Sequence, residues 1–234
     1  MKWEVERLAE VDSTNRYVLD QAKQGAAAGL VVVAEHQTAG RGRLDRAWQA
    51  PPGSSLLVSV LLDARAGGPH AAVVAVAVAL SEAVRAVTGL AVGLKWPNDL
   101  VVRDRKLAGI LAEVEGDAVV VGAGCNVNWT TFPSELAATA TACNLETGHV
   151  VDRDALLDAF VGRLGPCLDD PGATAVVYRD RLVTLGEQVR VDRGRDEVVG
   201  EAVAVRDDGA LVVRDDTGIE HDIVVGDVIH LRPA

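Results

Sequence analysis

The residues best suited to chemistry lie in one cationic stretch, EHQTAGRGRLDRAW, which spans residues 35–48. Arg41, Arg43 and Arg46 stand there among glycines and polar residues. The planar guanidinium group matches the oxygens of phosphates and carboxylates, and glycine lets a backbone approach a ligand closely. The stretch therefore predicts a site for an anion, with an exposed basic loop as the alternative. Its glycine spacing differs from that of the Walker phosphate-binding loop.

A second group of polar side chains lies in VGLKWPNDLVVRDRKLAGIL, residues 92–111. Lys95, Asn98 and Asp99 precede one short apolar strand, and Lys106 begins the next. Pro97 lacks a backbone N–H for a sheet, so it indicates a bend between strands. These strand ends are adjacent, which favours a shared polar site over ordinary solvation of separate side chains.

A third polar group, Asp12-Ser13-Thr14-Asn15, precedes a helical pattern that runs to about residue 23. Asp12 or Ser13 is expected to cap this helix by accepting a backbone hydrogen bond. The alternative is that the hydroxyl groups face a small polar ligand at the helix start. Gln37 ends the apolar strand 30–36, and ligands of open sheets gather at such strand ends.

The elements that must position these groups follow from hydrophobic periodicity. Strands are predicted at 30–36, 55–62 and 118–125, a long helix at 69–88, and a helix from Asp152, as its cap, to about residue 168. From Gly186 the chain changes to short alternating strands with turns at Asp208-Gly209 and Thr217-Gly218, which predicts a small β-barrel. The sequence thus predicts a domain of residues 1–185 and a second of residues 186–234.

Composition narrows the class of protein. The chain has 234 residues, 49% of them hydrophobic, and a formal net charge of −11. An acidic balance argues against a nucleic-acid-binding protein. Three cysteines without a CxxC pair suit a reducing compartment. The N-terminus has no signal-peptide pattern, and the longest apolar run, residues 71–80, is too short to span a bilayer. A cytoplasmic protein without membrane contact is expected.

Five motifs together carry a resemblance to a known family. DSTN at 12–15, EHQTAGRGR at 35–43 followed by Trp48, KWPNDL at 95–100, RKLAGIL at 105–111 and GAGCNVN at 122–128 resemble the motifs of the biotin–protein ligases in order and spacing. The resemblance covers essentially the whole chain. It implies an α+β fold, with a mixed-sheet catalytic domain of the biotin/lipoate ligase type and a small C-terminal SH3-like β-barrel.

The resemblance also implies roles for individual residues. Ser13, Thr14 and Gln37 would bind the ureido ring of biotin, and Arg41, Gly42 and Arg43 its carboxylate and the adenylate phosphate. Trp48 would pack on adenine. The catalytic assignments are Arg43, Lys106 and, as a candidate proton acceptor, Asp99. The full expected binding set is Ser13, Thr14, Asn15, Gln37, Arg41, Gly42, Arg43, Trp48, Lys95, Asn98, Lys106, Gly109 and Asn128.

By the same resemblance, the enzyme would join biotin and ATP into biotinyl-5′-AMP and pass biotin to a lysine of a biotin carboxyl carrier domain of a carboxylase. Mg²⁺ is expected with the nucleotide, although the sequence offers no metal-ligand set. Ser13 lies too close to Met1 to leave room for the DNA-binding domain of the repressor-type relatives, so no DNA partner is expected. The sequence does not decide whether the protein forms a homodimer.

Two alternatives and one departure remain at this stage. An octanoyltransferase or lipoate ligase would share the fold, and Cys125 near a strand end is a candidate nucleophile for the former. A biotin-sensing binding protein would share the site without turnover. The departure is Leu44-Asp45, because relatives often have a glycine two residues after the second arginine. An added carboxylate there should weaken an anion-binding loop slightly. The barrel would serve either packing or closure of the site.

Overall fold

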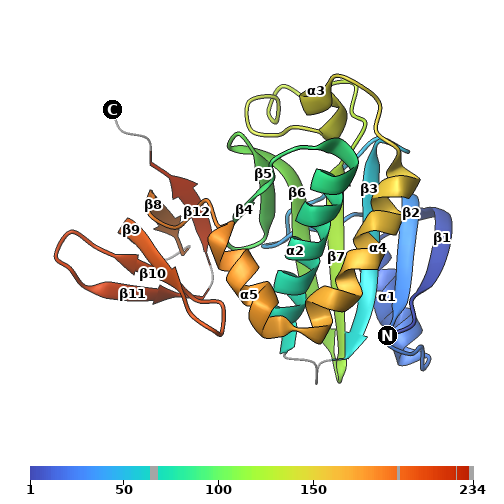
Figure 1. The fold of residues 1–234 in the computed structure, drawn as a ribbon, viewed down its shortest axis with the longest axis horizontal. Coiled ribbons are helices and arrows are strands. Elements are labelled where there is room, and N and C mark those ends of the chain that lie inside the picture. Colours follow the sequence, from blue (N-terminus) through green and yellow to red (C-terminus); the bar gives the residue numbers. More distant parts are fainter. Residues whose placement is uncertain (64–67, 194–195, 225, 232–234) are drawn as a thin grey trace.

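Strands rich in β-branched residues form a mixed sheet in the first part of the chain (Figure 1). The structure is a computed structural model, and it describes residues 1–63, 68–193, 196–224 and 226–231. The strand order is β1-β2-β3-β7-β6-β5-β4, with β1 and β2 parallel and the other neighbours antiparallel. The strands are β1 Glu4–Val11, β2 Leu30–Gln37, β3 Ser55–Asp63, β4 Gly93–Lys95, β5 Asp99–Val102, β6 Arg105–Glu115 and β7 Ala118–Asn126.

Helices cover the two faces of this sheet unequally (Figure 1). Two long helices, α2 and α4, pack on one face, and the short helix α1 packs on part of the other. The remainder of the second face is left open for the polar stretches of the sequence. The helices are α1 Thr14–Lys23, α2 Gly68–Thr88, α3 Cys143–Thr147, α4 Arg153–Asp169 and α5 Pro171–Asp180.

The central strands are covered on both faces, which explains why their sequences are continuous apolar runs. In β2, Val31 and Val33 belong to the core beneath α2 and α4, whereas Val32 belongs to a smaller core beneath α1. Successive side chains of a strand point to opposite faces, so a strand covered on both faces must be apolar at nearly every position. β7 departs from this rule, because Gly122 and Gly124 take the α1 face while Ala123 and Cys125 take the core face.

Helix α2 is the most apolar element of the chain. By length and composition alone it could cross a membrane. In the folded chain, however, 61% of its most apolar window is buried, and residues such as Val76 and Leu80 are fully enclosed against the sheet. The helix is therefore accounted for as the core helix of a globular domain, as the predicted buried helix at 69–88 requires.

The last part of the chain forms a second, wholly antiparallel sheet with the order β11-β10-β9-β8-β12. It lies beside β4 and α5 in Figure 1. The expected α+β arrangement, a mixed-sheet domain followed by a small barrel-like domain, is confirmed. The boundary after residue 185 stays a prediction. The strands are β8 Gln188–Asp192, β9 Glu197–Val205, β10 Leu211–Arg214, β11 Glu220–Ile223 and β12 Asp227–His230.

One of the two predicted helix caps is wrong. Ser13 occupies the N-cap position of α1, but its side chain makes no capping hydrogen bond. Asp12 instead accepts the N–H of Ser13 at 2.6 Å, and the N–H of Thr14 donates to Gln37 Oε1 at 2.8 Å. A side chain from another strand has thus replaced the local cap. The Asp152 cap of α4 is present, with its carboxylate accepting two backbone N–H groups.

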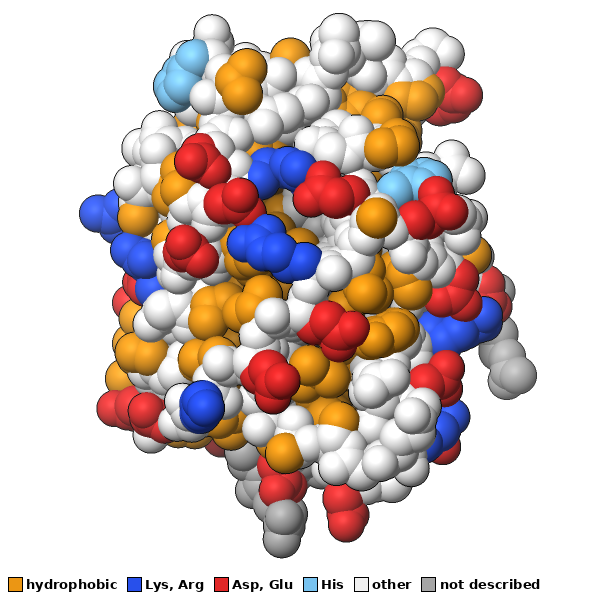
Figure 2. Space-filling view, turned by 90° about the vertical axis from the view of Figure 1, so that its right-hand side faces the viewer, with side chains coloured by type: hydrophobic (Ala, Val, Ile, Leu, Met, Phe, Trp, Pro, Cys, Tyr) orange, Lys and Arg blue, Asp and Glu red, His pale blue; other side chains and the backbone are white. Residues whose placement is uncertain are grey.

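The side of the molecule that carries β1 is shown in Figure 2. Lysine and arginine side chains near the middle of this face are flanked by acidic ones, and hydrophobic side chains are exposed between them. Charges of both signs are therefore interspersed on this face, in spite of the acidic total.

Candidate active site

A cavity of about 630 Å³ opens on the face of the sheet that α1 leaves uncovered. Its size lies within the range of small-molecule sites, roughly 300–1,000 Å³. Three segments that are distant in sequence meet there: the start of α1, the arginine loop of residues 38–49, and the adjoining ends of β4, β5 and β6. All but one of the expected binding residues line it, together with the catalytic candidate Asp99. The binding residues are Ser13, Thr14, Asn15, Gln37, Arg41, Gly42, Arg43, Trp48, Lys95, Asn98, Lys106 and Gly109.

One end of the cavity is closed by a buried polar network. Gln37 Oε1 accepts hydrogen bonds from both the N–H and the hydroxyl of Thr14, at 2.8 and 2.9 Å. The hydroxyl of Ser59 lies 2.7 Å from Thr14 Oγ1 and donates to Asn15 Oδ1 at 2.6 Å. Ser13, Thr14 and Asn15 are each less than 5% exposed. Buried polar groups are retained where they are paired, so this end is built to receive a polar head group.

The arginine loop folds back on itself beside that network. The N–H of Trp48 donates to the carbonyl of Gly40 at 2.9 Å, and Arg41 bridges Ala47 in antiparallel fashion. Leu44 and Asp45 at its tip have φ angles of 54° and 57°. This left-handed region favours glycine, so the loop tip holds two non-glycine residues in a backbone conformation that glycine adopts at lower cost.

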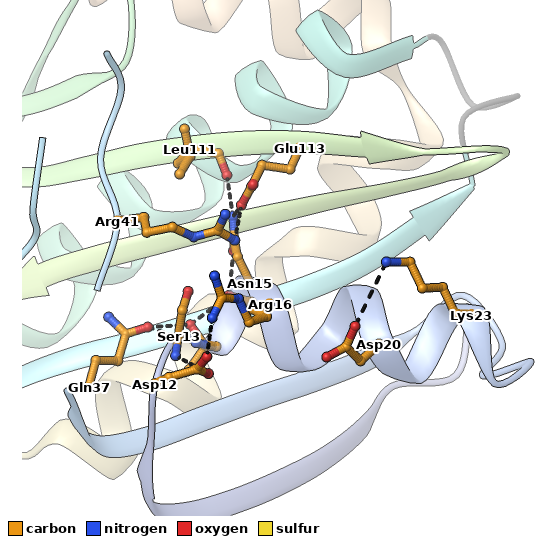
Figure 3. Close-up of polar contacts among 12 residues, drawn as sticks. Asp12, Ser13, Asn15, Arg16, Asp20, Lys23, Gln37, Arg41, Leu111 and Glu113 are labelled. Carbon is orange, nitrogen blue, oxygen red and sulfur yellow. Dashed lines mark hydrogen bonds and ion pairs between the residues drawn. The ribbon is translucent and has the colours of Figure 1, made fainter. Parts of the chain in front are cut away.

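The arginines of the loop have different neighbours. Arg41 forms an ion pair of 2.8 Å with Glu113 on β6, close to the polar end (Figure 3). Arg43 donates to Asn98 Oδ1 at 3.3 Å, at the end of the cavity that β4 and β5 supply. Asn98 is itself held by donation to the carbonyl of Ile110 at 2.7 Å. The loop therefore spans the cavity, with one arginine directed to each half.

Lysines and a carboxylate occupy the middle of the cavity. Lys106 forms an ion pair of 2.7 Å with Asp99, and its Nζ lies 5.7 Å from the centre of the Trp48 ring. Burial lowers the pKa of Lys95, while Asp99 and Asp104 raise it and Lys106 lowers it further. A partly buried cluster of this kind attracts an anion, because its positive groups are screened by solvent less than surface charges are.

The floor of the cavity includes two glycines that lie side by side on neighbouring strands. Gly109 on β6 pairs in register with Gly124 on β7. A Cβ at Gly124 would lie 2.4 Å from Trp48 Cε2, and one at Gly109 would lie 3.0 Å from Trp48 Cζ3. The Trp48 ring therefore rests on bare backbone, a close approach that any larger residue would prevent. It is placed to act as an aromatic platform.

Asn128 is the expected binding residue that the structure does not bring into the cavity. Its side chain donates to the carbonyl of Val151 at 2.8 Å and accepts the N–H of the same residue at 2.9 Å. Both ends of the amide are thus used in holding the chain before α4. The structure therefore gives Asn128 a structural role, and its membership of the binding set stays a prediction.

Cys125 also lies away from the cavity. Its side chain is fully buried in the core beneath α2, on the opposite face of β7 from Gly124. The neighbouring thiol of Cys143 and burial raise the pKa of the Cys125 thiol well above its usual range. A thiol that is protonated and shut away from the site cannot serve as a nucleophile, so the octanoyltransferase alternative loses its key residue.

Several residues that line or support the cavity were not expected from the sequence. Ser59 is a single polar residue in an apolar strand, and Glu113 looks like an ordinary solvated strand residue. Trp129 and Phe132 stack with ring centres 4.3 Å apart and line the cavity, as do Val228 and Ile229 of β12. Of these residues, only Ser59 could have been recognised from the sequence. It is a lone hydroxyl within an apolar strand, and a buried hydroxyl needs a hydrogen-bond partner.

The comparisons with known proteins agree with this site. The family model described as "Biotin/lipoate A/B protein ligase family" matches residues 8–128, just over half of the chain. The model described as "Biotin protein ligase C terminal domain" matches residues 184–231. The chain belongs to the biotin/lipoate A/B protein ligase family. The family resemblance seen in the sequence motifs is therefore confirmed.

Relatives and solved structures narrow the branch. A biotin–[acetyl-CoA-carboxylase] ligase of Mycobacterium tuberculosis is 38% identical, covering 96% of this chain and 88% of that one. A second, of Paracoccus denitrificans, is 34% identical over 90% and 94%. The fold resembles that of the biotin protein ligase from Aquifex aeolicus in complex with biotin and ATP, with a TM-score of 0.86, 28% identity, and coverage of 98% and 99%. The expected ATP-dependent ligase of the biotin type is thus confirmed at the level of the enzyme class.

Proposed function

We propose that this chain joins biotin and ATP into biotinyl-5′-AMP and then transfers biotin to a lysine of a biotin carboxyl carrier domain. The observation that carries the proposal is one continuous cavity with three differing parts. It has a buried polar end, a cationic middle and an aromatic platform. These suit a ureido ring, a carboxylate beside a phosphate, and an adenine ring, in that order along the cavity.

The first step brings two anions together. A biotin carboxylate oxygen forms a bond to the α-phosphorus of ATP, the bond from that phosphorus to the bridging oxygen breaks, and pyrophosphate leaves. The carboxylate is already ionised near neutral pH, so no general base is required. Arg43 and Lys106 line the cavity, where they would neutralise the repulsion and the charge that develops in the transition state.

The second step needs a neutral amine. The acceptor lysine attacks the acyl carbon, its nitrogen forms the amide bond, and the bond to the AMP oxygen breaks. The amine must also lose a proton, and Asp99 is the carboxylate of this region that we assign to accept it. Asp99 lines the cavity and lies 2.7 Å from Lys106 Nζ, within the region where the acceptor amine would attack.

Mg²⁺ would come with the nucleotide. The described residues contain no group of three or more His, Cys, Asp or Glu side chains that could hold a metal. Mg²⁺ in nucleotide sites is commonly held by one or two carboxylates together with the substrate phosphates. Asp104 lines the cavity and fits that pattern, so it is the residue that we assign to it. The ion would supply neutralisation of phosphate charge.

The closed end of the cavity favours biotin over a lipoyl or octanoyl group. A ureido ring offers two N–H donors and one carbonyl acceptor, which the hydroxyls and amides of Ser13, Thr14 and Gln37 can pair. A hydrocarbon chain or a dithiolane ring could form none of these hydrogen bonds. A site built for hydrogen bonds rejects ligands that lack them.

Charge, cysteine content and helix burial bear on whether DNA or a membrane is a partner and on the cellular compartment. A net charge of −11, with acidic and basic side chains interspersed on the face of Figure 2, supports the inference that DNA is not a partner. Three free, buried cysteines support a cytoplasmic location, and the burial of α2 supports the inference that no membrane is involved. The oligomeric state, including a homodimer, is left to measurement.

The deciding experiment is pyrophosphate release from ATP with Mg²⁺ and either biotin, lipoate or octanoate. Release that depends on biotin, followed by biotin transfer to a purified carrier domain, would support the proposal. Release with lipoate alone would keep the fold and replace the substrate. Biotin binding by calorimetry without pyrophosphate release would show a sensing protein without turnover.

A further inference from the structure

The carboxylate of Glu113 is the point at which the arginine loop and the polar end of the cavity meet (Figure 3). Glu113 Oε2 accepts a hydrogen bond from Arg41 Nη2 at 2.8 Å and another from Asn15 Nδ2 at 2.8 Å. The Glu113 side chain is only 24% exposed. One oxygen atom on β6 therefore ties the loop after β2 to the first turn of α1.

Asn15 is fixed on every side by this arrangement. Besides Glu113, its Nδ2 donates to the carbonyl of Leu111 at 3.1 Å, and its Oδ1 accepts from Ser59 at 2.6 Å. A Cβ at Gly122 would lie only 2.1 Å from Asn15 Oδ1. Its amide is fully hydrogen-bonded and closely packed, so Asn15 connects α1 to β3 and β6.

Arg41 is only half satisfied. Its Nη2 is held by Glu113, but its Nε is buried and has no hydrogen-bond partner among the described residues. A buried donor without a partner costs free energy unless something else pairs with it. Arg41 lines the cavity, so a bound ligand is the natural partner for this N–H. Glu113 thus holds the guanidinium in place by one nitrogen and leaves another for the ligand.

We propose that Glu113 is a positioning residue that sets the affinity for biotin by fixing Arg41 and Asn15 relative to each other. The inference rests on the proposed function. Glu113 neutralises one charge of a loop that carries three arginines and keeps that arginine at the polar end. Without the carboxylate, Arg41 loses its anchor on the sheet. Its role lies in binding of biotin, whereas Arg43 and Lys106 face the nucleotide side.

The test compares Glu113→Gln with Glu115→Gln. Glu115 lies two residues along the same strand and is 52% exposed, with Lys23 at 3.7 Å, so it is a matched control outside the cavity. The change turns the charge-assisted hydrogen bond with Arg41 into a neutral one, which predicts a rise of roughly tenfold in the biotin dissociation constant of E113Q. The biotin KM should rise in parallel, with the ATP KM unchanged and E115Q like the wild type.

The outcomes separate this inference from the proposed function. A wild-type protein that binds no biotin overturns both. A wild-type protein that binds biotin, with E113Q equal to E115Q, overturns the inference alone. An equal rise in the KM for ATP and for biotin also overturns it, because that result would indicate a general loss of structure.

A second measurement does not depend on biotin. Trypsin cleaves after arginine, and the loop offers three such bonds, of which the one after Arg46 is exposed and those after Arg41 and Arg43 are partly buried. E113Q without ligand should be cleaved there several-fold faster than E115Q, since anchoring slows local opening. Arg41→Gln removes the other member of the same ion pair. If Glu113 acts through Arg41, the double variant should bind biotin no more weakly than the weaker single variant, whereas multiplying effects would refute the coupling.

Discussion

At the scale of single residues, the cationic side chains of the site have different partners. Arg41 lies against Glu113, whereas Arg43 contacts the neutral amide of Asn98. Lys106 has the carboxylate of Asp99 as its partner. Arg43 lies at the end of the cavity that β4 and β5 supply. Under the proposed function this is the nucleotide side, so Arg43 is the residue that we expect to contribute most to the stabilisation of a developing negative charge.

Replacement of Arg43 by alanine should therefore slow the formation of biotinyl-5′-AMP. The expected loss is roughly a hundredfold, or about 3 kcal/mol of transition-state stabilisation. Single-turnover pyrophosphate release measures it directly. Arg7→Ala is the control, because Arg7 is an exposed residue of β1 that pairs with Asp154. An unchanged rate in Arg43→Ala would remove this residue from the reaction.

Asp45 offers a test of backbone conformation. Its φ of 57° is one that glycine adopts without cost, whereas left-handed geometry costs other residues on the order of 1 kcal/mol. Asp45→Gly should raise the melting temperature by roughly 2–4 °C, the shift expected of about 1 kcal/mol in a protein of this size. Calorimetry measures it. Asp45→Ala keeps the strain and should give no such rise, so equal melting temperatures for both variants would contradict the explanation.

Sequence reasoning at this scale succeeded where a residue type is demanded by chemistry. The arginines, Lys106 and Gln37 all reach the cavity. It did not predict the partners of side chains that have more than one use for their polar atoms. The Asn128 amide forms both of its hydrogen bonds with the backbone of Val151. Ser13 does not cap α1, and the N–H of Thr14 donates to the Gln37 side chain instead. Neither partner is near in sequence, so no local pattern could reveal these contacts.

At the scale of elements, β7 is the strand that gives the cavity its depth. Its core face carries Ala123 and Cys125, and its cavity face carries Gly122 and Gly124. The apolar run at 118–121 predicts the strand, since residues 119–121 are buried between the two layers of helices and Ala118 is partly buried. The glycine face could not be assigned from sequence, because glycine at alternate positions equally indicates a weak strand or a bulge.

A methyl group on this face should close the polar end. A Cβ at Gly122 would overlap Asn15 Oδ1 at 2.1 Å, so Asn15 or the strand must move. Gly122→Ala should raise the biotin KM by between about fivefold and a hundredfold, the effect of overpacking by roughly 1–3 kcal/mol. Gly162→Ala in α4 is the control, since nothing lies within 4 Å of the added atom. A normal KM in Gly122→Ala would mean that the strand end is not the ring site.

The strands and long helices were predictable because each has a clear period or an unbroken apolar run. Their pairing was not. The adjacency of β3 and β7, or of Asn15 and Glu113, joins residues that are far apart in the chain. Only the order of motifs in a known family could place them together before the structure was available.

At the scale of the whole molecule, the barrel is joined to the site through the turn between β9 and β10. Trp96 Nε1 donates to the carbonyl of Gly209 at 2.9 Å, and Lys95 and Asn98 flank that tryptophan in the cavity wall. A Cβ at Gly209 would lie 2.3 Å from His70 Nδ1. Val228 and Ile229 complete the lining. These contacts favour closure of the site over packing alone as the role of the barrel.

His70 makes this joint sensitive to pH. Burial lowers the pKa of His70 from its ordinary value of 6.5, and Asp208 opposes that effect. Because the folded state disfavours the protonated ring, the stability from this contact is fully present above about pH 6.5 and is lost as the pH falls below it. The pKa of His230 is lowered as well, by burial and by Lys95, so it acts in the same direction.

The melting temperature should therefore fall more between about pH 7.5 and about pH 5.5 in the wild type than in His70→Gln, which cannot be protonated. Calorimetry at the two pH values measures the difference. His149→Gln serves as the control, since His149 is an exposed residue far from the barrel in sequence. An identical pH dependence in the wild type and His70→Gln would show that this contact does not titrate.

The position of Trp48 gives the molecule a built-in optical reporter. Its ring lies on the bare backbone of Gly109 and Gly124, beside the ammonium group of Lys106. Trp96 and Trp129 also line the cavity, but both are almost fully buried, so Trp48 is the most accessible of the three lining tryptophans to a ligand. A change in the intrinsic fluorescence on ligand binding is therefore expected to come mainly from Trp48. Occupancy of the site can be followed in real time without any label.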